Sequence, residues 1–492
     1  MGDILYLLLP VVFPITSGAL IWAVKPGRRA VRCLSFLAFG TEILFVALAG
    51  MAAFGKTAGI WQLCQGLEIR LRLDGLGLLM AVLVPSVWLL AAVFSFEYML
   101  HEEEEYRLFG CFLMSSGALI GVACAANFVT LYTFFELMTL ASVPLVFHSR
   151  KKQAIRAGMV YLAYSMFGAS LALGSFFFLS HYTSDMNFAL GGVLEAEKAA
   201  GHENFLHVLA FLSIAGFGAK AGLMPLHPWL PTAHPVAPAP GSAVLSGLIT
   251  KAGIVAVIRM AYYIFGVEFL AGSWVQTVLL SMALITVFMG SMLAYKEKKL
   301  KKRLAYSSVS QLSYALFGIF LLSPEGLYGA LLQVVFHALT KNTLFLCAGA
   351  VIYKTGKKWV YDLRGIGKEM PVVMWCFTLA AVSLVGIPPA GGFLAKWHLA
   401  VGALEGSYGV ISYLGPAVLL ISALLTAGYL FPIFIEGFFP GNDYDYGSLK
   451  SAEPTLLMKV PLIVMSSALF LIGMFGTPLF TALRETAASM IV

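Results

Sequence analysis

Apolar runs long enough to cross a lipid bilayer recur from one end of the chain to the other, separated by short polar segments. A transmembrane helix needs roughly 17 to 25 mainly apolar residues, and about fourteen runs fit this requirement. The segments between them are too short for a soluble domain. The pattern therefore predicts an all-α integral membrane protein. The runs lie near residues 4–24, 31–54, 76–98, 108–126, 128–148, 156–180, 205–238, 239–265, 274–294, 304–322, 327–352, 371–402, 410–437 and 457–480.

Two of these runs are interrupted by proline and glycine. Prolines crowd the stretch 225–240 of the seventh run, and "GIPPAGGFLAKWH" at 386–398 interrupts the twelfth. Proline removes a backbone donor and clashes with the preceding turn, so both spans are predicted to be discontinuous helices. Irregular backbone at membrane depth is tolerated only where protein buries it or where it lines water.

The two breaks lie five spans apart, which predicts two repeated units, helices 4–8 and helices 9–13. Because each unit has an odd number of spans, the second copy enters the membrane from the opposite side. Broken helices at matching positions of such inverted repeats indicate a transport site. The expected divisions are helices 1–3 at 1–107, the first repeat at 108–265, the second at 274–437, and helix 14 with a tail at 457–492.

Charged residues are sparse, at 12% of the chain with a net charge of +7, and their positions predict the orientation. Basic residues gather in loops that follow odd-numbered spans, at 28–32, 150–156, 296–303 and 354–368. The positive-inside rule makes these loops cytoplasmic, so both termini are expected outside. The first run has no basic segment before it and no cleavage pattern after it, and we interpret it as a retained span.

Motifs of soluble enzyme chemistry are missing from the sequence. The six cysteines occur singly, without a C-x-x-C pair, and fit the role of small apolar packing residues. We find no P-loop, no G-x-S-x-G, no H-E-x-x-H and no paired aspartates. The sequence therefore predicts no catalytic centre, no metal, no cofactor and no nucleic-acid partner.

Ionisable residues inside the predicted spans are few, and these are the candidates for function. A charge at the bilayer centre costs at least about 2.5 kcal/mol, so such residues mark ion pathways more often than not. The alternative is that each is a satisfied packing charge, or that it snorkels to an interface. The main candidates are Glu136, Lys220, Lys251, His337, Lys341 and Lys396, and the weaker ones, a relay or gate, are Glu42, His227 and His234.

These residue types suit proton transfer. Burial favours the neutral form of a lysine, and a nearby carboxylate favours the charged form, so moving the carboxylate switches the lysine. Lys220 paired with Glu136 would form such a switch. Lys251, His337, Lys341 and Lys396, joined by water, would form a proton relay along the midplane of the membrane.

Several stretches resemble one known family. They are "LYTFFEL", "GAKAGLMPLHPWLPTAH" followed by "LITKAG", "FHALTKNTLFL" and "GIPPAGGFLAKW". In this order, over roughly residues 70–435, the chain is similar to the antiporter-like proton-channel subunits of respiratory complex I, of Mrp-type sodium/proton antiporters and of energy-converting membrane-bound hydrogenases. The resemblance implies a fourteen-helix fold with inverted repeats in the cytoplasmic (inner) membrane of a prokaryote. It also implies partner membrane subunits, transport of protons with Na+ as a second candidate ion, and, in the redox complexes, a peripheral redox arm.

The resemblance also assigns positions. Glu136 matches the family's fifth-helix glutamate, Lys220 the lysine of the broken seventh helix, and Lys396 the exit residue of the twelfth. Lys251 matches the eighth-helix lysine, and His337 and Lys341 match the eleventh-helix pair. Two departures are Thr232, where relatives usually have aspartate, and Val160, where many have lysine.

The type of complex is less clearly marked by the sequence. The lack of a long amphipathic extension after the fourteenth span argues against the largest complex I subunit. Lys396 favours a D-type Mrp subunit or its hydrogenase counterpart, since the fourth-type complex I subunit tends to carry glutamate there. Two alternatives remain open, an autonomous ion-coupled solute symporter and a non-conducting scaffold subunit.

Overall fold

The computed structural model describes residues 2–64, 67–442, 444–445 and 451–491. Nearly all of this part of the chain is helical. The helices of the first half are α1 (Gly2–Val24), α2 (Arg28–Ala52), α3 (Gly75–Tyr98), α4 (Glu105–Ala123), α5 (Phe128–Val146), α6 (Lys152–Leu179), α7 (Ala196–Ala199), α8 (Glu203–Gly218), α9 (Trp229–Ala233), α10 (Ala239–Val244) and α11 (Lys251–Ile258). Those of the second half are α12 (Val267–Leu270), α13 (Trp274–Lys296), α14 (Leu300–Phe320), α15 (Pro324–Thr355), α16 (Ile366–Glu369), α17 (Pro371–Val385), α18 (Gly391–Glu405), α19 (Ile411–Phe438), α20 (Leu456–Phe475) and α21 (Thr477–Ser489).

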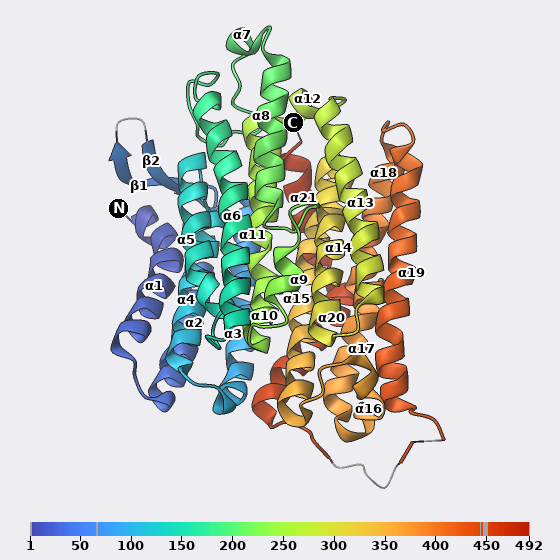
Figure 1. Ribbon diagram of the computed structural model, residues 1–492. Coiled ribbons are helices and arrows are strands. Elements are labelled where there is room, and N and C mark those ends of the chain that lie inside the picture. The colour runs from blue at the N-terminus through green and yellow to red at the C-terminus, as the bar shows by residue number, and fades with distance from the viewer. Residues whose placement is uncertain (1, 65–66, 443, 446–450, 492) are drawn as a thin grey trace.

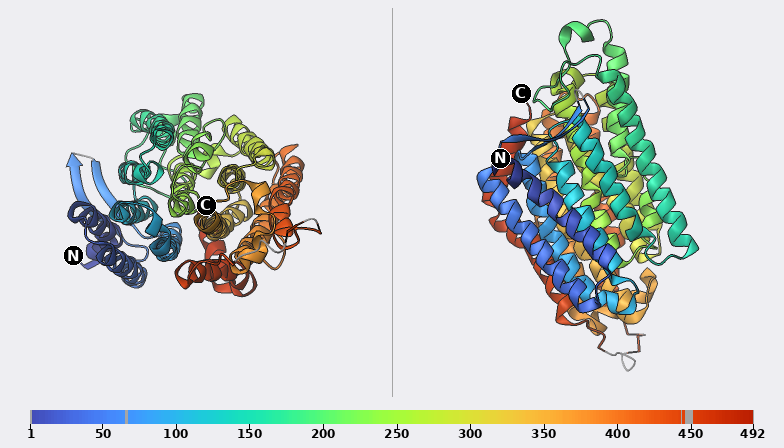
Figure 2. Two further views of the ribbon diagram at one scale, coloured as in Figure 1. Left: turned by 60° about the horizontal axis from the view of Figure 1, so that its bottom comes forward. Right: turned by 90° about the vertical axis from the view of Figure 1, so that its left-hand side faces the viewer.

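Eleven helical segments of the described chain are long and apolar enough to span a membrane, and shorter apolar helices accompany them. This confirms the predicted all-helical membrane protein. The helices stand side by side in one bundle, with the N-terminal helices on one side and α18 and α19 on the other (Figure 1). The view towards the end of the bundle shows the same arrangement (Figure 2).

Two helical segments occupy the centre of the bundle. The apolar part of 239–265 is 100% buried by other helices, and that of α15 is 94% buried, whereas only a third of α1, α2 and α19 is covered. The central segments are therefore shielded from lipid. They carry Lys251, His337 and Lys341.

Both interruptions predicted from proline and glycine are present. α8 ends at Gly218, and irregular backbone leads to the short helix α9. α17 ends at Val385, where Gly386 adopts φ 90°, and α18 begins at Gly391. A Cβ at Gly386 would approach Cδ of Lys396 to 2.9 Å, so this break needs glycine for both its backbone angle and its close packing.

The eighth predicted span, 239–265, is a helix with two wider turns. Leu245–Ile249 and Arg259–Phe265 are π-helical, and α11 lies between them. The first wide turn comes directly before Lys251. Single π-helical turns inside α-helices occur frequently at functional sites.

A β-hairpin and several one-turn helices were not predicted. β1 (Thr57–Cys64) pairs antiparallel with β2 (Leu67–Arg72) in the segment between α2 and α3. The final segment, expected as one helix with a tail, forms two helices, α20 and α21, which meet at Gly476.

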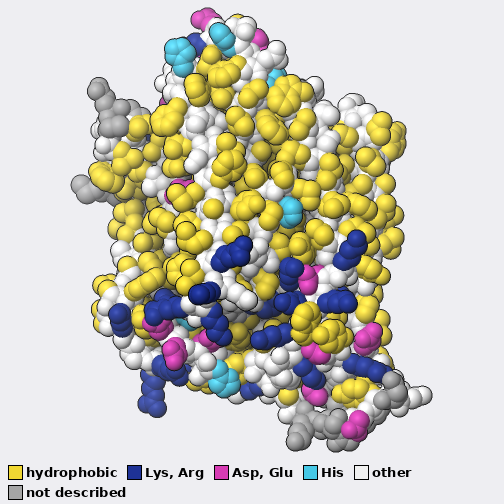
Figure 3. Space-filling view, in the orientation of Figure 1, with side chains coloured by type: hydrophobic (Ala, Val, Ile, Leu, Met, Phe, Trp, Pro, Cys, Tyr) yellow, Lys and Arg dark blue, Asp and Glu magenta, His cyan; other side chains and the backbone are white. Residues whose placement is uncertain are grey.

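Charge divides the two ends of the bundle. Lys and Arg side chains gather towards the lower end of the face in Figure 3, whereas its middle and upper parts are mainly apolar. Both chain ends lie towards the upper end in the side views (Figures 1 and 2). The basic side chains and the chain ends are thus separated along the bundle axis.

Candidate functional site

Lys220 lies just beyond the end of α8 in a pocket of hydroxyl groups. Its ammonium donates hydrogen bonds to Thr139 Oγ1 at 2.7 Å, to the Tyr161 hydroxyl at 2.9 Å and to Ser165 Oγ at 3.0 Å. The Tyr161 ring lies 4.4 Å from the same nitrogen. The lysine is 1% exposed. Neutral oxygens from α5 and α6 therefore replace its water shell.

Glu136 lies on α5, one turn before Thr139. Thr139 bonds Lys220, so the carboxylate lies one helical turn from a partner of that lysine, yet Glu136 and Lys220 form no ion pair within 4 Å among the described residues. One carboxylate oxygen, Oε1, is buried without a hydrogen-bond partner in this part of the chain. The carboxylate is thus close enough to influence Lys220 and is not locked to it.

Lys251 and His337 are in direct contact at the centre of the bundle. Lys251 Nζ and His337 Nδ1 form a hydrogen bond of 2.6 Å between α11 and α15. Lys251 also donates to the Ser246 carbonyl at 3.2 Å, which belongs to the wide turn before α11. A Cβ added at Gly253 would lie 3.0 Å from Cβ of Lys220, so α11 also packs closely against Lys220.

Lys341 follows His337 by one turn on α15. Its ammonium donates to the Leu304 carbonyl at 3.1 Å and to the Ser307 hydroxyl, both on α14. Lys341 is fully buried, as is Lys251. The two amines and the imidazole between them thus form one polar row inside the apolar bundle.

A small cavity connects this row to Lys396. It has a volume of about 10 Å³, enough for roughly one water molecule, and its walls include His337, Gln311, Ser383 and Lys396. Nε2 of His337, the amide nitrogen of Gln311 and the hydroxyl of Ser383 have no hydrogen-bond partner among the described residues. Polar groups of this kind are suitable partners for a water molecule.

Lys396 lies in the first turns of α18 and binds the end of α17. Its ammonium donates to the carbonyl oxygens of Leu384 at 2.6 Å and Val385 at 2.7 Å. A cation at a helix C-terminus stabilises the exposed carbonyl groups there. The second break therefore holds its lysine through freed backbone groups.

The three weaker candidates lie apart from this row or at its edge. Glu42 is buried between α2 and α4, where it accepts a hydrogen bond from Ser116 at 2.7 Å. His227 is half-buried in the first break. His234 is fully buried, and its ring packs at a tilt against Phe345 of α15 with ring centroids 4.8 Å apart. Neither of its ring nitrogens has a hydrogen-bond partner among the described residues.

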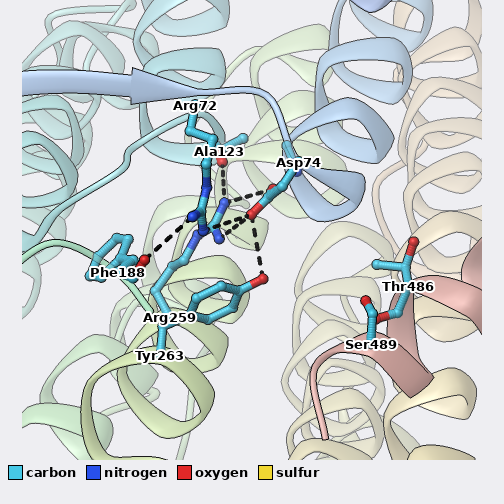
Figure 4. Close-up of polar contacts among 9 residues, drawn as sticks. Arg72, Asp74, Ala123, Phe188, Arg259, Tyr263, Thr486 and Ser489 are labelled. Carbon is cyan, nitrogen blue, oxygen red and sulfur yellow. Dashed lines mark hydrogen bonds and ion pairs between the residues drawn. The ribbon is translucent and has the colours of Figure 1, made fainter. Parts of the chain in front are cut away.

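Sequence reasoning missed the hydroxyl groups around the lysines and also an ion pair. Arg259, in the second wide turn of the central helix, is fully buried and binds Asp74 with two hydrogen bonds, of 2.5 and 2.9 Å (Figure 4). Arg72 and Tyr263 also contact Asp74. Arg259 is an ionisable residue inside the predicted span 239–265, which is the criterion that identified Lys251. The sequence therefore contained the information needed to identify Arg259 as well.

Asp74 begins α3 and accepts a hydrogen bond from the Gly77 amide at 2.9 Å. Burial raises the pKa of this carboxyl, but the charge and hydrogen bonds of Arg259 lower it more, and the resulting pKa is about 2. The carboxylate therefore stays ionised at neutral pH. It joins the start of α3 to the far end of the helix that carries Lys251.

Comparison with known proteins gives consistent matches. Residues 125–424 match the family described as "NADH:quinone oxidoreductase/Mrp antiporter, TM", and residues 65–109 match "NADH-Ubiquinone oxidoreductase (complex I), chain 5 N-terminus". The chain is 30% identical over 499 residues to the NADH-quinone oxidoreductase subunit N of Desulforudis audaxviator, with 98% of each chain covered. It is 28% identical to a Na(+)/H(+) antiporter subunit of Alkalihalophilus pseudofirmus, covering 96% of this chain and 94% of the relative.

A solved structure shares the fold. A chain of the Mrp complex from a Dietzia species superposes with a TM-score of 0.85 at 23% identity, covering 100% of this chain and 98% of the other. At this identity the likeness establishes the fold alone.

Proposed function

The chain belongs to the family of membrane subunits shared by NADH:quinone oxidoreductases and Mrp antiporters, and from this premise we propose that it translocates protons. Members of this family work in multisubunit membrane complexes, and this chain is an antiporter-like subunit of such a complex. The proton route and the role of each residue are our proposal.

The proposed route follows the polar row across the bundle. Glu136 sets the charge of Lys220, the proton passes by way of Lys251 and His337, and Lys396 releases it. Lys341 lies beside His337 and acts on the same proton through its charge. Helix α11, which packs against Lys220 and carries Lys251, joins the two ends of the route.

One observation carries this proposal, the hydrogen bond between Lys251 and His337 beside a cavity that reaches Lys396. An amine and an imidazole in contact share one proton more readily than they hold two, because two like charges repel in a low-dielectric interior. A proton arriving on one group therefore displaces a proton from the other. A water molecule in the adjoining cavity would be the next proton acceptor.

We further propose about fourteen membrane crossings. In addition to the eleven long apolar segments, α14, the α8–α9 pair and the α17–α18 pair each provide one further crossing. The broken pairs support the inverted repeats, because each places a lysine at its interruption. With the basic loops inside, both termini are outside.

The test replaces single lysines by methionine, whose side chain is similar in length to that of lysine but has no group that binds a proton. Lys220→Met and Lys251→Met should each lower proton uptake by vesicles containing the purified complex at least tenfold. Uptake is measured with a pH-sensitive dye at matched complex content. Lys302→Met is the control, because Lys302 pairs with Glu297 at the surface end of α14, at 2.8 Å, and should leave uptake unchanged.

The scaffold alternative gives the opposite result. A subunit that only holds its neighbours needs no titrating lysines, so both buried variants would then assemble and take up protons like the parent complex. Normal uptake in Lys220→Met and Lys251→Met would therefore overturn the relay.

A further inference from the structure

A large cavity lies away from the polar row, between α3, α15, α20 and α21. Its volume is about 650 Å³. The walls within the bundle are aliphatic, with Leu79, Val82, Leu83 and Val87 from α3 and Val335 and Leu339 from α15. An apolar cavity of this kind does not hold stable water. It is therefore suited to an apolar ligand.

The length of the cavity matches one leaflet of a bilayer. Its wall on α3 extends from Gly75 to Val87, which at 1.5 Å per residue is about 18 Å. Half of a hydrocarbon core is about 15 Å thick. Val82 is 52% exposed on this wall, although it lies in the middle of a membrane-spanning segment. The cavity thus has the depth of an acyl chain that enters from the leaflet on the α21 side.

The volume also suits an acyl chain. A cavity of about 150 Å³ lined by Leu, Ile and Phe binds benzene, with six carbons. At the same density, a space of about 650 Å³ accommodates roughly two dozen carbons. This is enough for one long acyl chain and the glycerol region next to it.

Polar groups gather at one end of the cavity, on α21. They are Glu485, Thr486 and Ser489, and Ser86 of α3 also lines the cavity. The Thr486 hydroxyl donates to the Ala482 carbonyl and the Ser489 hydroxyl to the Thr486 carbonyl, so both oxygens remain available as acceptors. A carboxylate with two acceptor hydroxyls is complementary to an ammonium group.

α21 is held close to the start of α3 at this end. A Cβ at Gly75 would lie 2.5 Å from Thr486 Oγ1, so the two helices touch there. Thr486 and Ser489 are seen beside the beginning of α3 in Figure 4. The polar end is therefore part of a fixed wall.

We propose that this cavity binds a membrane phospholipid with a primary-ammonium headgroup, its acyl chain between α3 and α15 and its ammonium at Glu485. Val335 and Leu339 lie one turn apart on the face of α15 that lines the cavity and would contact the acyl chain. His337 lies midway between them in sequence, so its side chain points to the opposite face of the helix. The lipid thus supports the helix that carries His337 and keeps water from reaching it by this side.

The experiment measures lipid retained by the purified complex. The complex is stripped of lipid, placed in bilayers of equal phosphatidylethanolamine and phosphatidylglycerol, re-extracted, and analysed for bound lipid by mass spectrometry. The parent should retain phosphatidylethanolamine, and Val82→Trp, which fills the cavity, should retain several-fold less. Leu140→Trp is the matched control, since Leu140 on α5 is 58% exposed and lies outside the cavity. It should behave like the parent.

Two further variants test the occupant. Glu485→Gln should reduce the preference for phosphatidylethanolamine over phosphatidylglycerol several-fold. Equal retention in Val82→Trp and the parent would overturn the lipid site, and an unchanged preference in Glu485→Gln would overturn the headgroup assignment. If a thiol crosslinker at Val82→Cys joined this chain to another subunit in the assembled complex, the occupant would be protein and the proposal would be wrong.

Discussion

At the scale of single residues, the buried amines are held by neutral partners. Lys220 binds three hydroxyl groups, Lys251 an imidazole, and Lys396 two carbonyl oxygens. An amine in a fixed buried ion pair gives up its proton at the cost of leaving a carboxylate uncompensated. An amine held by hydroxyls or carbonyls does not incur this penalty. The partners therefore suit groups that change protonation during a cycle.

Lys396 provides a test that separates proton release from helix capping. Lys396→Arg keeps a cation that can donate to the Leu384 and Val385 carbonyls, but a guanidinium does not lose its proton in proteins. We expect Lys396→Arg to assemble normally and to transport protons at least tenfold more slowly. The rate is measured in vesicles at matched complex content.

Lys396→Met serves as the comparison, because it has neither donors nor a titratable group. We expect it to be inactive as well and to be less stable than Lys396→Arg. An Arg variant that transports like the parent would mean that Lys396 only binds the end of α17 and that protons leave elsewhere.

At the scale of secondary-structure elements, the important groups lie where helices break, widen or begin. Lys396 binds the last carbonyls of α17, and Lys251 follows a wide turn. At the other end of the central helix, Arg259 binds Asp74 at the start of α3. The ion pair with Asp74 ties the Arg259 end of the central helix to the start of α3.

The Asp74–Arg259 pair predicts a defined loss of stability. Asp74→Asn leaves the buried Arg259 guanidinium uncompensated, which typically costs about 3–5 kcal/mol. Samples of the purified chain are heated to a series of temperatures, and size-exclusion chromatography measures the fraction that remains folded at each temperature. Asp185→Asn is the control, because Asp185 is exposed in a loop, and its change should be within about 0.5 kcal/mol.

The same pair predicts the pH dependence. The pKa of Asp74 is lower in the folded protein, about 2, than its ordinary value of 3.8. The ionised carboxylate of Asp74 therefore contributes fully to the free energy of unfolding above pH 4, and this contribution disappears as the pH falls towards 2. The stability difference between the parent and Asp74→Asn should shrink over that interval. A difference that stays constant down to pH 2 would contradict the assignment.

At the scale of the whole molecule, one end of the bundle is basic and the other carries both chain ends (Figures 1 and 3). In the orientation that we propose from the positive-inside rule, the basic end faces the cytoplasm. The cavity proposed for lipid has its polar rim on α21, which lies towards the opposite end. In that orientation, the basic end and the proposed lipid site face opposite surfaces of the membrane.

The orientation is tested with two exposed serines in loops. Ser149 precedes the basic segment at the start of α6, and Ser184 lies in the loop between α6 and α7. In a background with Cys33→Ser and Cys64→Ser, a membrane-impermeant thiol reagent added to intact cells should label Ser184→Cys and not Ser149→Cys. The reversed pattern would place both termini inside.

Length, hydropathy and the residues that break helices determined much of this protein from the sequence alone. A span needs only a local apolar run, and Pro388 or Gly386 interrupts a helix wherever the chain goes. A lysine inside such a run is likewise visible without a structure, because burying its charge is costly in any fold. The spans, both breaks and the candidate residues follow from these local rules.

Only the tertiary structure decided which of these residues meet. Lys251 and His337 are 86 positions apart, and Asp74 and Arg259 are 185 apart, so no local pattern joins them. Thr139 looked like an ordinary helix residue, because a hydroxyl in an apolar helix usually bonds its own backbone; only packing against Lys220 makes it a ligand. The cavity beside α21 exists for the same reason, since empty space between helices is a property of their packing and of no single segment.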